Sequence, residues 1–459
     1  MHELPLSGSR RRLTGWGRTS PAYCDVLSVR SPDEVAGALA SAPARGVLAR
    51  GLGRSYGDLA QNGGGVVIDM TGIDDIVELD VEQGIVTARS GCSLAQLLAV
   101  SVPAGWFLPV TPGTRDVTIG GAVACDIHGK NHHRDGAFGR HVLSLTLLDP
   151  GGEIRTLSAE STPEEFDATV GGLGLTGVIL DATLRLLRIE TTTMRVDVER
   201  ARDIEDAFAR LTATDHLYRY SVAWIDGRAQ GRKLGRSILL RGDHAGVSEL
   251  PPADRATPLR ADRVRTVRVP SWASVSPLLR GAPGDAFNEL YFRRAREGRG
   301  MLEPLGPYFY PLDALRDWNR LYGRTGFLQY QFAIPFGCER EVVEILRLVS
   351  GLRPVLGVLK RFGDESGPLS FPIPGWTLAL DIALPVAGLN TVLDRADEIV
   401  AQAGGRVYLA KDARLRDAAF AAMYPRLGEW RRTHARLDPD GRMRGDLARR
   451  LRITERQAA

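Results

Sequence analysis

The segment from Ala49 to Asp58 constrains the chain most, because three glycines stand within it at Gly51, Gly53 and Gly57. Glycine accepts positive φ and lets the backbone approach a ligand closely, so the N–H groups of such a loop can converge on a diphosphate. Because the segment ends a short apolar run, it predicts a pyrophosphate cradle at the end of a strand. A glycine-rich turn without a ligand is the alternative for this segment taken alone.

Two common phosphate motifs do not fit this loop. A P-loop ends in Gly-Lys-Ser/Thr, whereas the Gly129–Lys130 pair of this chain continues with Asn131. A dinucleotide fingerprint of the G-x-G-x-x-G type opens a helix, but this loop leads into Gly63–Gly65, which disfavours a helix. We therefore expect the loop to run from strand to strand.

Length and charge narrow the class of protein. A chain of 459 residues exceeds one typical core, so we expect two or more domains. The 59 basic and 55 acidic residues give a net charge of +4, which is too balanced to indicate a nucleic-acid-binding face. The four cysteines, at positions 24, 92, 125 and 338, are too scattered for a disulfide framework and predict free thiols.

The chain shows no sign of a membrane span or a secretion signal. Arg10–Arg12 is not followed by the apolar run that a secretion signal requires. No apolar run reaches the roughly 18 residues that cross a bilayer.

Short β-rich runs separated by turns predict the strands of the first half. They cover 46–49, 66–70, 76–79, 85–88, 142–148, 154–157 and 178–186. The first four predict one small mixed sheet. Ser93 precedes Leu94, Leu97 and Leu98 at helical spacing, which predicts a helix capped by its hydroxyl.

Composition changes near Glu190, where we expect a domain boundary. Segments 326–332 and 376–381 alternate with period two, as half-buried strands lining a cavity do. Segments 342–349 and 389–403 predict amphipathic helices, and 250–307 predicts an irregular, Pro- and Arg-rich insert.

Two further glycine-rich segments accompany the first, at 112–129 and 171–177. An extended cofactor needs close backbone approach at several places, so three such loops favour a dinucleotide over a lone phosphate. All three resemble the FAD loops of the vanillyl-alcohol-oxidase superfamily, whose FAD-binding domain is of the PCMH type.

Four other segments narrow the resemblance. Cys125–His133, Phe327–Phe332, Phe371–Trp376 and Ala410–Asp412 resemble the flavoenzymes that oxidise a polyprenylphosphoryl ribose in mycobacterial arabinan synthesis. The likeness covers nearly the whole chain. It implies an α+β fold with an FAD-binding domain at 5–190, a substrate domain on an antiparallel sheet at 191–405, and a segment at 406–459 that returns to the first domain.

The resemblance also implies the FAD-binding residues. They are Ala49, Arg50, Gly51, Leu52, Gly53, Arg54, Ser55, Tyr56, Gly57, Asp58, Leu59, Gly113, Thr118, Ile119, Gly120, Gly121, Cys125, Asp126, Ile127, His128, Val178 and Tyr408. Many superfamily members attach the flavin covalently through a histidine at the place of Arg54. Arginine cannot form that bond, so we expect non-covalent, dissociable FAD.

Alcohol oxidation needs a group that takes the hydroxyl proton beside the flavin. The resemblance offers Lys411, Tyr56 and His128, and the sequence does not choose among them. It further implies substrate contacts at Lys130, Trp224, Gln329, Gln331, Lys360, Phe362, Thr377 and Ala379. Solvent-facing polar residues on a sheet are the alternative for the glutamines and Lys360, and plain core is the alternative for the aromatic residues.

One position departs from the mycobacterial pattern. The relatives carry an asparagine and, two residues later, a cysteine that nitroaromatic inhibitors modify, whereas this chain has Thr377 and Ala379. Without the thiol we expect reversible inhibition at best.

His128, His132 and His133 raise the possibility of a metal site. Nearby glycine and asparagine disfavour the helix that would bring the first two together, and no acidic ligand has a zincin spacing, so we expect no metal. Backbone pairing is the alternative for His132 and His133.

The resemblance implies FAD-dependent oxidation of the ribose 2-hydroxyl of decaprenylphosphoryl-β-D-ribose to a 2-keto intermediate, the first half of an epimerisation that supplies arabinose for cell-wall arabinan. It implies a short-chain dehydrogenase-type reductase as partner and a peripheral place on the cytoplasmic or periplasmic face of the inner membrane. The basic segment Phe292–Arg299 suggests contact with anionic lipid, with a solvated disordered loop as the alternative. An oxygen-using sugar-alcohol or aldonolactone oxidase and a non-catalytic lipid-carrier binding protein are the competing functions.

Overall fold

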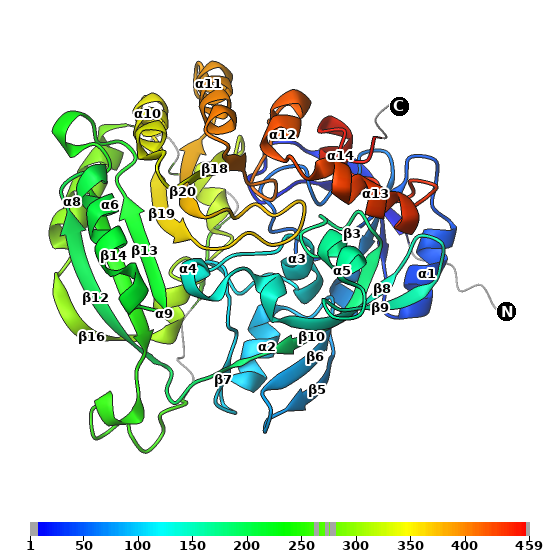
Figure 1. Cartoon of the computed structure of the whole chain (residues 1–459), viewed down its shortest axis with the longest axis horizontal. Helices are drawn as coiled ribbons and strands as arrows, with labels where there is room; N and C mark the ends of the chain where they lie inside the picture. Colours follow the sequence, from blue (N-terminus) through cyan, green and yellow to red (C-terminus); the bar gives the residue numbers. More distant parts are fainter. Residues whose placement is uncertain (1–7, 261–265, 271–274, 276–280, 456–459) are drawn as a thin grey trace.

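The computed structural model describes residues 8–260, 266–270, 275 and 281–455. Strands and helices are both abundant, and the larger sheets differ in the direction of their strands, so the fold is α+β as predicted. Figure 1 shows the sheet of β12–β20 on one side of the molecule and the sheets of β3–β10 on the other.

The first sheet carries the first glycine-rich loop. Its strand order is β1-β2-β4-β3, in which β2, β4 and β3 run parallel and β1 is antiparallel to β2. Its strands are β1 (Gly8–Leu13), β2 (Ala22–Ser28), β3 (Val47–Arg50) and β4 (Val66–Asp69). The loop therefore leaves β3 and returns along β4, from strand to strand as expected.

The second sheet is antiparallel, with the order β5-β6-β10-β8-β9. Its strands are β5 (Ile76–Asp80), β6 (Ile85–Arg89), β8 (Val142–Leu148), β9 (Ile154–Leu157) and β10 (Val178–Arg185). The prediction of one small mixed sheet over the first four runs is wrong, because β3 and β4 join β2 in the first sheet, whereas β5 and β6 join β10 in the second. Long-range partners decide the pairing, and the local pattern does not contain them.

The third sheet has the order β16-β12-β14-β13-β19-β20-β18-β21, and every neighbouring pair is antiparallel. Its strands are β12 (Thr193–Ala201), β13 (Tyr220–Ile225), β14 (Ser237–His244), β16 (Gly298–Pro304), β18 (Phe327–Pro335), β19 (Leu356–Phe362), β20 (Gly375–Ala383) and β21 (Arg406–Val407). Two small pairs complete the strands: β7 (Trp106–Phe107) with β11 (Leu187–Arg188), and β15 (Val267–Arg268) with β17 (Leu315–Arg316).

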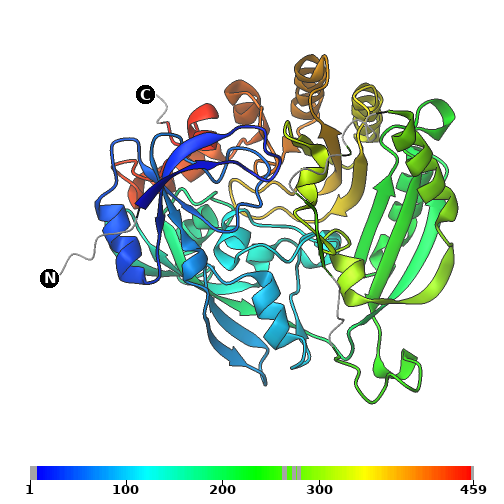
Figure 2. The same ribbon diagram turned by 180° about the vertical axis from the view of Figure 1, so that it is seen from behind.

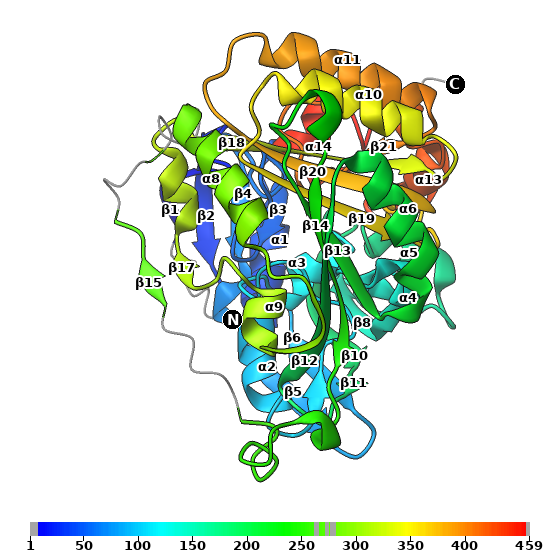
Figure 3. The same ribbon diagram turned by 90° about the vertical axis from the view of Figure 1, so that its left-hand side faces the viewer.

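Helices cover one face of the third sheet. The apolar residues of α6 (Ile204–Thr214), α10 (Glu339–Ser350) and α11 (Leu389–Gln402) pack with one face of the strands in a single buried cluster. Figure 3 shows α10 and α11 side by side beside β18 and β20. Both predicted amphipathic helices are confirmed, and each presents buried side chains at helical spacing, such as Val342, Leu346 and Val349 on α10.

The remaining α-helices are shorter or lie at the edges of the sheets. They are α1 (Pro32–Ala40), α2 (Leu94–Ser101), α3 (Ile119–Ala124), α4 (His132–Asp135), α5 (Pro163–Thr169), α8 (Ala282–Arg294), α9 (Leu305–Phe309), α12 (Asp417–Met423), α13 (Leu427–Leu437) and α14 (Asp446–Arg450). Single 3₁₀ turns occupy η1 (Met70–Gly72), η2 (Phe138–His141), η3 (Asp215–Leu217), η4 (Gly231–Lys233), η5 (Val247–Glu249) and η6 (Trp318–Tyr322). The predicted cap of α2 is confirmed, since Ser93 accepts from the Gln96 N–H while Gln96 accepts from the Ser93 N–H.

The insert at 250–307 is more regular than expected. Part of it lies outside the described residues, but α8 and β16 occupy most of its second half. Phe292–Arg294 end α8, so a disordered loop over Phe292–Arg299 is wrong. The Glu297 carboxylate also accepts from Arg200, which ties this segment to β12.

The C-terminal helices pack against the first two sheets, as the red ribbon beside α1 and α5 in Figure 1 shows. On α13, the Trp430 indole N–H donates to the Ala168 carbonyl at 2.9 Å. On α14, the Arg450 guanidinium donates to both oxygens of Asp58 at 2.8 Å. Figure 2, seen from behind, shows the β1–β2 hairpin in front of these helices.

Two expectations from the sequence concern a membrane span and the domain boundaries. Among the described residues, no helix has both the length and the apolar character to cross a membrane. The predicted domain boundaries near 190 and 405 stay a prediction.

Candidate active site

A cavity of about 910 Å³ lies between the third sheet and the three glycine-rich loops. One wall is formed by β13, β14, β18, β19 and β20, and the opposite wall by main chain of the loops and of α3. The loops that suggested a cofactor and the strands that suggested a substrate therefore face the same space.

Strand periodicity selects the side chains of the sheet wall. On β18, Leu328, Tyr330 and Phe332 point into the helix-covered core, whereas Gln329 and Gln331 line the cavity. The same alternation brings Lys360 on β19, Ala379 and Asp381 on β20, and Trp224 on β13 to the cavity. The inward direction expected for the glutamines and Lys360 is confirmed.

The loop wall is largely bare of side chains. A Cβ at Gly113 or Gly174 would meet no atom within 4 Å and would project into the cavity, and Gly174 has φ +72. At Gly51 a Cβ would lie 2.1 Å from the Thr118 hydroxyl, so only glycine fits between this loop and the start of α3.

This wall fits FAD. The bare main chain leaves room for close contact with a flat, extended ligand. The Ser90 hydroxyl also lines the cavity, and it is buried without a hydrogen-bond partner in the described part of the chain. A bound cofactor would supply that partner.

Lys411 lies against Tyr56 at the junction of the two walls. Its ammonium is 3.7 Å from the centre of the Tyr56 ring, and both residues line the cavity. Burial lowers the pKa of Lys411 to about 8, while the Asp381 carboxylate counteracts this shift. Burial raises the pKa of Tyr56 well above its usual value, so the phenol keeps its proton at neutral pH.

Asp381 is a buried carboxylate in the same corner. One of its oxygens accepts from the Gln329 amide, and the other has no hydrogen-bond partner among the described residues. Burial raises the pKa of Asp381 to about 6. The residue is 1 % exposed, so it faces the cavity interior rather than solvent.

His128 is held from both sides. Lys360 Nζ lies 3.0 Å from its Nδ1, and Gln331 Nε2 lies 3.0 Å from its Nε2. Burial and the charge of Lys360 lower its pKa well below 6.5, so the imidazole is neutral. Phe362 packs edge-on against the ring, with centroids 4.8 Å apart.

Two further lysines lie in the cavity wall. Burial, together with the charges of Lys411 and Lys130, lowers the pKa of Lys360 to about 7. Burial also lowers the pKa of Lys130 to about 7. The Lys130 ammonium donates to the Tyr308 carbonyl and lies 4.0 Å from the centre of that residue's ring. A bound anion would stabilise the charged forms of both lysines.

Arg54 occupies the place for which the sequence resemblance implies a flavin-linking histidine in many superfamily members. Its guanidinium stacks 4.0 Å above the Trp16 ring and pairs with Asp116 at 2.8 Å. Nearby, the Tyr408 hydroxyl donates to the Cys125 carbonyl at 3.1 Å, and burial raises the pKa of the Cys125 thiol to about 11. The thiol is therefore neutral and a poor nucleophile.

Most of the predicted site residues line this cavity. They are Ala49, Arg50, Gly51, Leu52, Gly53, Arg54, Ser55, Tyr56, Leu59, Gly113, Thr118, Gly120, Gly121, Cys125, Ile127, His128, Lys130, Trp224, Gln329, Gln331, Lys360, Ala379, Tyr408 and Lys411. The structure thus brings residues of the first two glycine-rich loops together with residues of four strands, β13, β18, β19 and β20, while their roles stay a prediction.

The other predicted residues lie behind the cavity wall, namely Gly57, Asp58, Ile119, Asp126, Val178, Phe362 and Thr377. Ile119 and Val178 point into the core, and Gly177 and Ile179 line the cavity in place of Val178.

Polar contacts hold the remaining residues of this group behind the wall. Asp58 pairs with Arg450, and Asp126 accepts from Ser366 and from the Gly139 N–H. Gln331 covers Thr377 through a 3.2 Å hydrogen bond. These side chains therefore support the cavity wall from behind and do not face the cavity.

An aromatic part of the wall was not among the residues predicted from the sequence. It is formed by Trp16, Tyr291, Tyr308, Phe309, Trp318 and Tyr322. Most of these lie in or near the segment expected to be irregular, where no periodic pattern marked them. Asp381 had a signal, since it shares the alternation of Thr377 and Ala379 on β20.

The histidines make no metal cluster. His132 begins the short helix α4, contrary to the expectation of no helix here, but His128 lies outside it. His132 accepts from the Gly363 N–H and His133 bonds to the Tyr218 carbonyl. Within the described ranges, no group of three His, Cys, Asp or Glu residues is placed to hold a metal ion.

Comparisons with known proteins agree with this geometry. The family described as FAD binding domain matches residues 25–158. The chain is 42 % identical over 453 residues to the decaprenylphosphoryl-beta-D-ribose oxidase of Mycolicibacterium smegmatis, covering 96 % of this chain and 98 % of the relative. It is 41 % identical over 371 residues to an uncharacterized Streptomyces coelicolor protein, covering 78 % and 99 %. L-gulonolactone oxidase 5 of Arabidopsis thaliana is 30 % identical over 149 residues, covering 31 % and 25 %.

Proposed function

The chain belongs to the family of FAD-dependent decaprenylphosphoryl-β-D-ribose oxidases, and from this premise we propose that it oxidises the ribose 2-hydroxyl of a polyprenylphosphoryl ribose to the 2-keto sugar. One observation carries the proposal. A single cavity has a bare main-chain wall suited to a flat cofactor and, opposite it, a wall of lysines and glutamines suited to a phosphorylated sugar. When bound, FAD supplies the hydride acceptor.

Lys130 and Lys360 bind the substrate phosphate in this proposal. Both line the cavity, and burial holds the pKa of each near 7, so an arriving phosphate stabilises their protonated forms. An ammonium in a partly desolvated site attracts phosphate more strongly than one in water. The two lysines therefore orient the substrate by its charged end.

Gln329 and Gln331 orient the sugar. They are successive inward-facing residues of β18, and their amides already pair with Asp381 and His128. Because each amide is held by a buried partner, its position is fixed before the sugar arrives. Neutral His128 supports this arrangement but has both ring nitrogens engaged, which makes it a poor proton acceptor.

Lys411 takes the hydroxyl proton on Nζ. Its pKa of about 8 leaves a substantial neutral fraction near physiological pH, whereas the high pKa of Tyr56 keeps that phenol protonated. The Asp381 carboxylate then stabilises the ammonium that forms, since the attraction raises the pKa of Lys411. Asp381 is a positioning residue in this scheme.

The prenyl chain leaves the cavity along α8. Trp224 packs against Tyr291 with ring centroids 4.9 Å apart, and Phe287, which also lines the cavity, is 61 % exposed. Arg293, Arg294, Arg296 and Arg299 follow on the same segment. We place the enzyme at the inner membrane as a peripheral protein that contacts anionic lipid here. Liposome co-sedimentation that is unchanged when these arginines become glutamine would reject this contact.

The keto product stays attached to its lipid carrier, so the next reaction must be a hydride addition to C2 from the opposite face. We propose a reductase of the short-chain dehydrogenase type as the partner that completes the epimerisation. Conversion of the substrate to the arabinose epimer by a mixture of both enzymes, with keto sugar accumulating when the reductase is left out, tests the pairing.

Anaerobic mixing tests the oxidation itself. Polyprenylphosphoryl ribose should reduce the flavin and bleach the flavin absorbance of the holoenzyme within a single turnover, and the exclusion of oxygen keeps the reduced flavin from being reoxidised. A flavin that stays oxidised with this substrate but produces steady peroxide with a soluble polyol in air would favour an aldonolactone or sugar-alcohol oxidase instead. Purified protein without flavin absorbance would favour a lipid-carrier binding protein.

FAD is held without a covalent bond, because Arg54 has no nucleophile for the flavin and is engaged by Trp16 and Asp116. Acid precipitation should therefore leave a colourless pellet and a yellow supernatant. Colour retained in the pellet would contradict this.

A further inference from the structure

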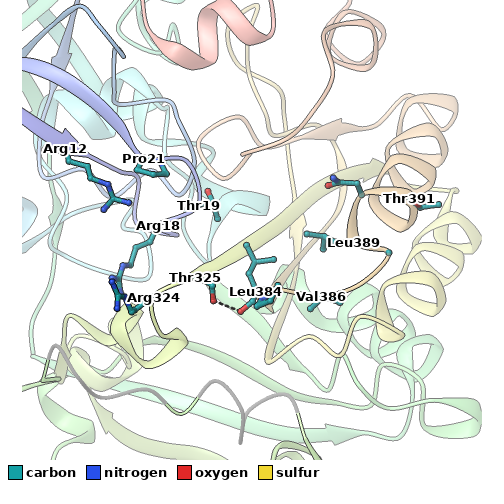
Figure 4. A pocket seen from close by; sticks show the side chains of 13 residues that line it. Arg12, Arg18, Thr19, Pro21, Arg324, Thr325, Leu384, Val386, Leu389 and Thr391 are labelled. Carbon is teal, nitrogen blue, oxygen red and sulfur yellow. Dashed lines mark hydrogen bonds between the residues drawn. The ribbon is translucent and has the colours of Figure 1, made fainter.

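A second pocket, with a volume of about 670 Å³, opens on the surface and shares no lining residue with the catalytic cavity. It lies where the end of β1 meets the start of β18 and the start of α11, as Figure 4 shows. Its lining residues are Arg12, Arg18, Thr19, Pro21, Arg324, Thr325, Leu384, Pro385, Val386, Gly388, Leu389, Asn390 and Thr391.

Three arginines give this pocket an uncompensated positive charge. Arg12, Arg18 and Arg324 gather on one side of it in Figure 4. Many arginines of this chain pair with carboxylates, as Arg450 does with Asp58 and Asp412. No residue lining the pocket is acidic, and within the described ranges none of the three arginines forms an ion pair. Like charges gathered without a counter-ion create a local positive potential, so the pocket is suited to an anion.

The opposite side of the pocket adds hydrogen-bond donors. Gly388–Thr391 form the start of α11, a 14-residue helix with no side-chain cap and no acidic residue in its first turn. The free N–H groups and the dipole of such a helix start favour an anion. Thr19 also lines the pocket, and its hydroxyl has no hydrogen-bond partner in the described part of the chain.

We propose that this pocket binds a phosphoryl group, independently of the oxidation chemistry. Three guanidinium groups offer more donors than the two oxygens of a carboxylate can accept, whereas a phosphoryl group presents three oxygens and a charge near −2. Leu384, Val386 and Leu389 form an apolar rim beside the charged side. The phosphoryl group comes from free phosphate or from a lipid headgroup, and the rim lets the second contribute apolar contact as well.

The pocket is connected to the aromatic wall of the catalytic cavity. Arg18 donates to the Gly323 carbonyl at 3.1 Å, and Asn319 donates to the Trp16 carbonyl at 2.9 Å. The rings of Trp16 and Trp318 lie 5.7 Å apart, and both line the catalytic cavity. An anion that fixes Arg18 and Arg324 therefore restrains the segment from Trp318 to Arg324, which forms part of that cavity wall.

Titration calorimetry on the FAD-loaded enzyme tests the site, with inorganic phosphate in one arm and monomeric dihexanoyl phosphatidic acid in the other. The test variant is Arg12→Gln/Arg324→Gln, because neither side chain has a hydrogen-bond partner in the described part of the chain. The matched control is Arg10→Gln, an exposed arginine of the same strand that does not line the pocket. Affinity should fall by about tenfold or more in the test variant and by less than about twofold in the control.

The two arms identify the source of the phosphoryl group. Tighter binding of the lipid than of phosphate indicates a headgroup, and equal affinities indicate a free anion. Phosphate should also slow amide hydrogen exchange over 318–324 in the parent enzyme and not in the test variant. Absence of binding in both arms, or an affinity and stoichiometry that are the same in the test variant and the parent enzyme, overturns the proposal. A separate binding event that is equal in parent, control and test variant belongs to the Lys130 and Lys360 site of the catalytic cavity. Neither result bears on the oxidation, which flavin bleaching tests separately.

Discussion

The two walls of the catalytic cavity are built differently. The loop wall consists of main chain at Gly51, Gly113 and Gly174, where what matters is that side chains are absent. The sheet wall consists of side chains such as Lys360 and Gln329, whose direction is set by strand alternation. In the proposed function, a cofactor common to many enzymes meets the first wall and a particular substrate meets the second. Damage to the two walls should therefore have different signatures, and the following experiments separate them.

Replacing Lys411 with methionine should cause the largest loss. If Nζ takes the hydroxyl proton, the rate of flavin reduction should fall by about 10²–10⁴-fold, the range typical of general-base catalysis. FAD content should stay normal, because the substitution removes a group beside the reacting hydroxyl and leaves the glycine-rich loops unchanged. Stopped-flow absorbance measures the rate, and Lys233→Met, at a side chain that is 63 % exposed, is the control. A variant with normal flavin reduction would remove Lys411 from the mechanism.

Replacing Gly51 with alanine should damage the other wall. The new Cβ would overlap the Thr118 hydroxyl, which caps α3 through the Gly121 N–H, so either the loop or the cap must move. We expect FAD affinity to fall by about 10- to 100-fold, corresponding to a steric cost of about 1–3 kcal/mol. The rise in flavin fluorescence when FAD dissociates from the diluted protein measures the affinity. A Cβ added at Gly428 would lie 4.0 Å from its nearest neighbouring atom, so the control variant Gly428→Ala should bind FAD normally.

The pH dependence of flavin reduction tests the state of Lys411. Only the unprotonated amine can accept a proton, so the rate should rise with pH and level off above the pKa of about 8. Between pH 7 and pH 9 the unprotonated fraction grows about tenfold for such a pKa. A rate that falls over this range would mean that the charged form is required.

The smallest expected effect concerns Ala379, where we expect no covalent reaction with an inhibitor. It lines the cavity on the sheet wall but carries no nucleophile, so a nitroaromatic inhibitor should bind reversibly and leave the intact mass unchanged. Ala379→Cys supplies a thiol at this position and should gain the mass of one adduct. An adduct on the parent chain would show that another thiol reacts.

The sequence predicted the parts of the fold that local patterns determine. Glycine clusters identified the loops, and period-two alternation brought Gln329, Gln331 and Lys360 to the cavity. Strand pairing was predicted less well, because β5 and β6 join β10 from a distant segment rather than their neighbours β3 and β4. The aromatic wall at Tyr308 and Trp318 was missed, since short irregular elements present no repeating pattern.

Asp381 shows a similar limit within the candidate site. Its position on β20 follows from the alternation, but its closeness to Gln329 depends on the register between β18 and β20, which pairs these two residues. Register is set by long-range packing of the sheet and the helices that cover it.

The salt bridges of Arg450 have a consequence for biosynthesis. This side chain clamps Asp58, next to the first glycine loop, and Asp412, next to Lys411, although it lies 392 residues after Asp58 in the chain. A ribosome delivers the loop long before the clamp. The nascent protein should therefore capture its flavin firmly only after this arginine has been synthesised, and a premature stop before it should yield an enzyme that loses its vitamin-derived cofactor.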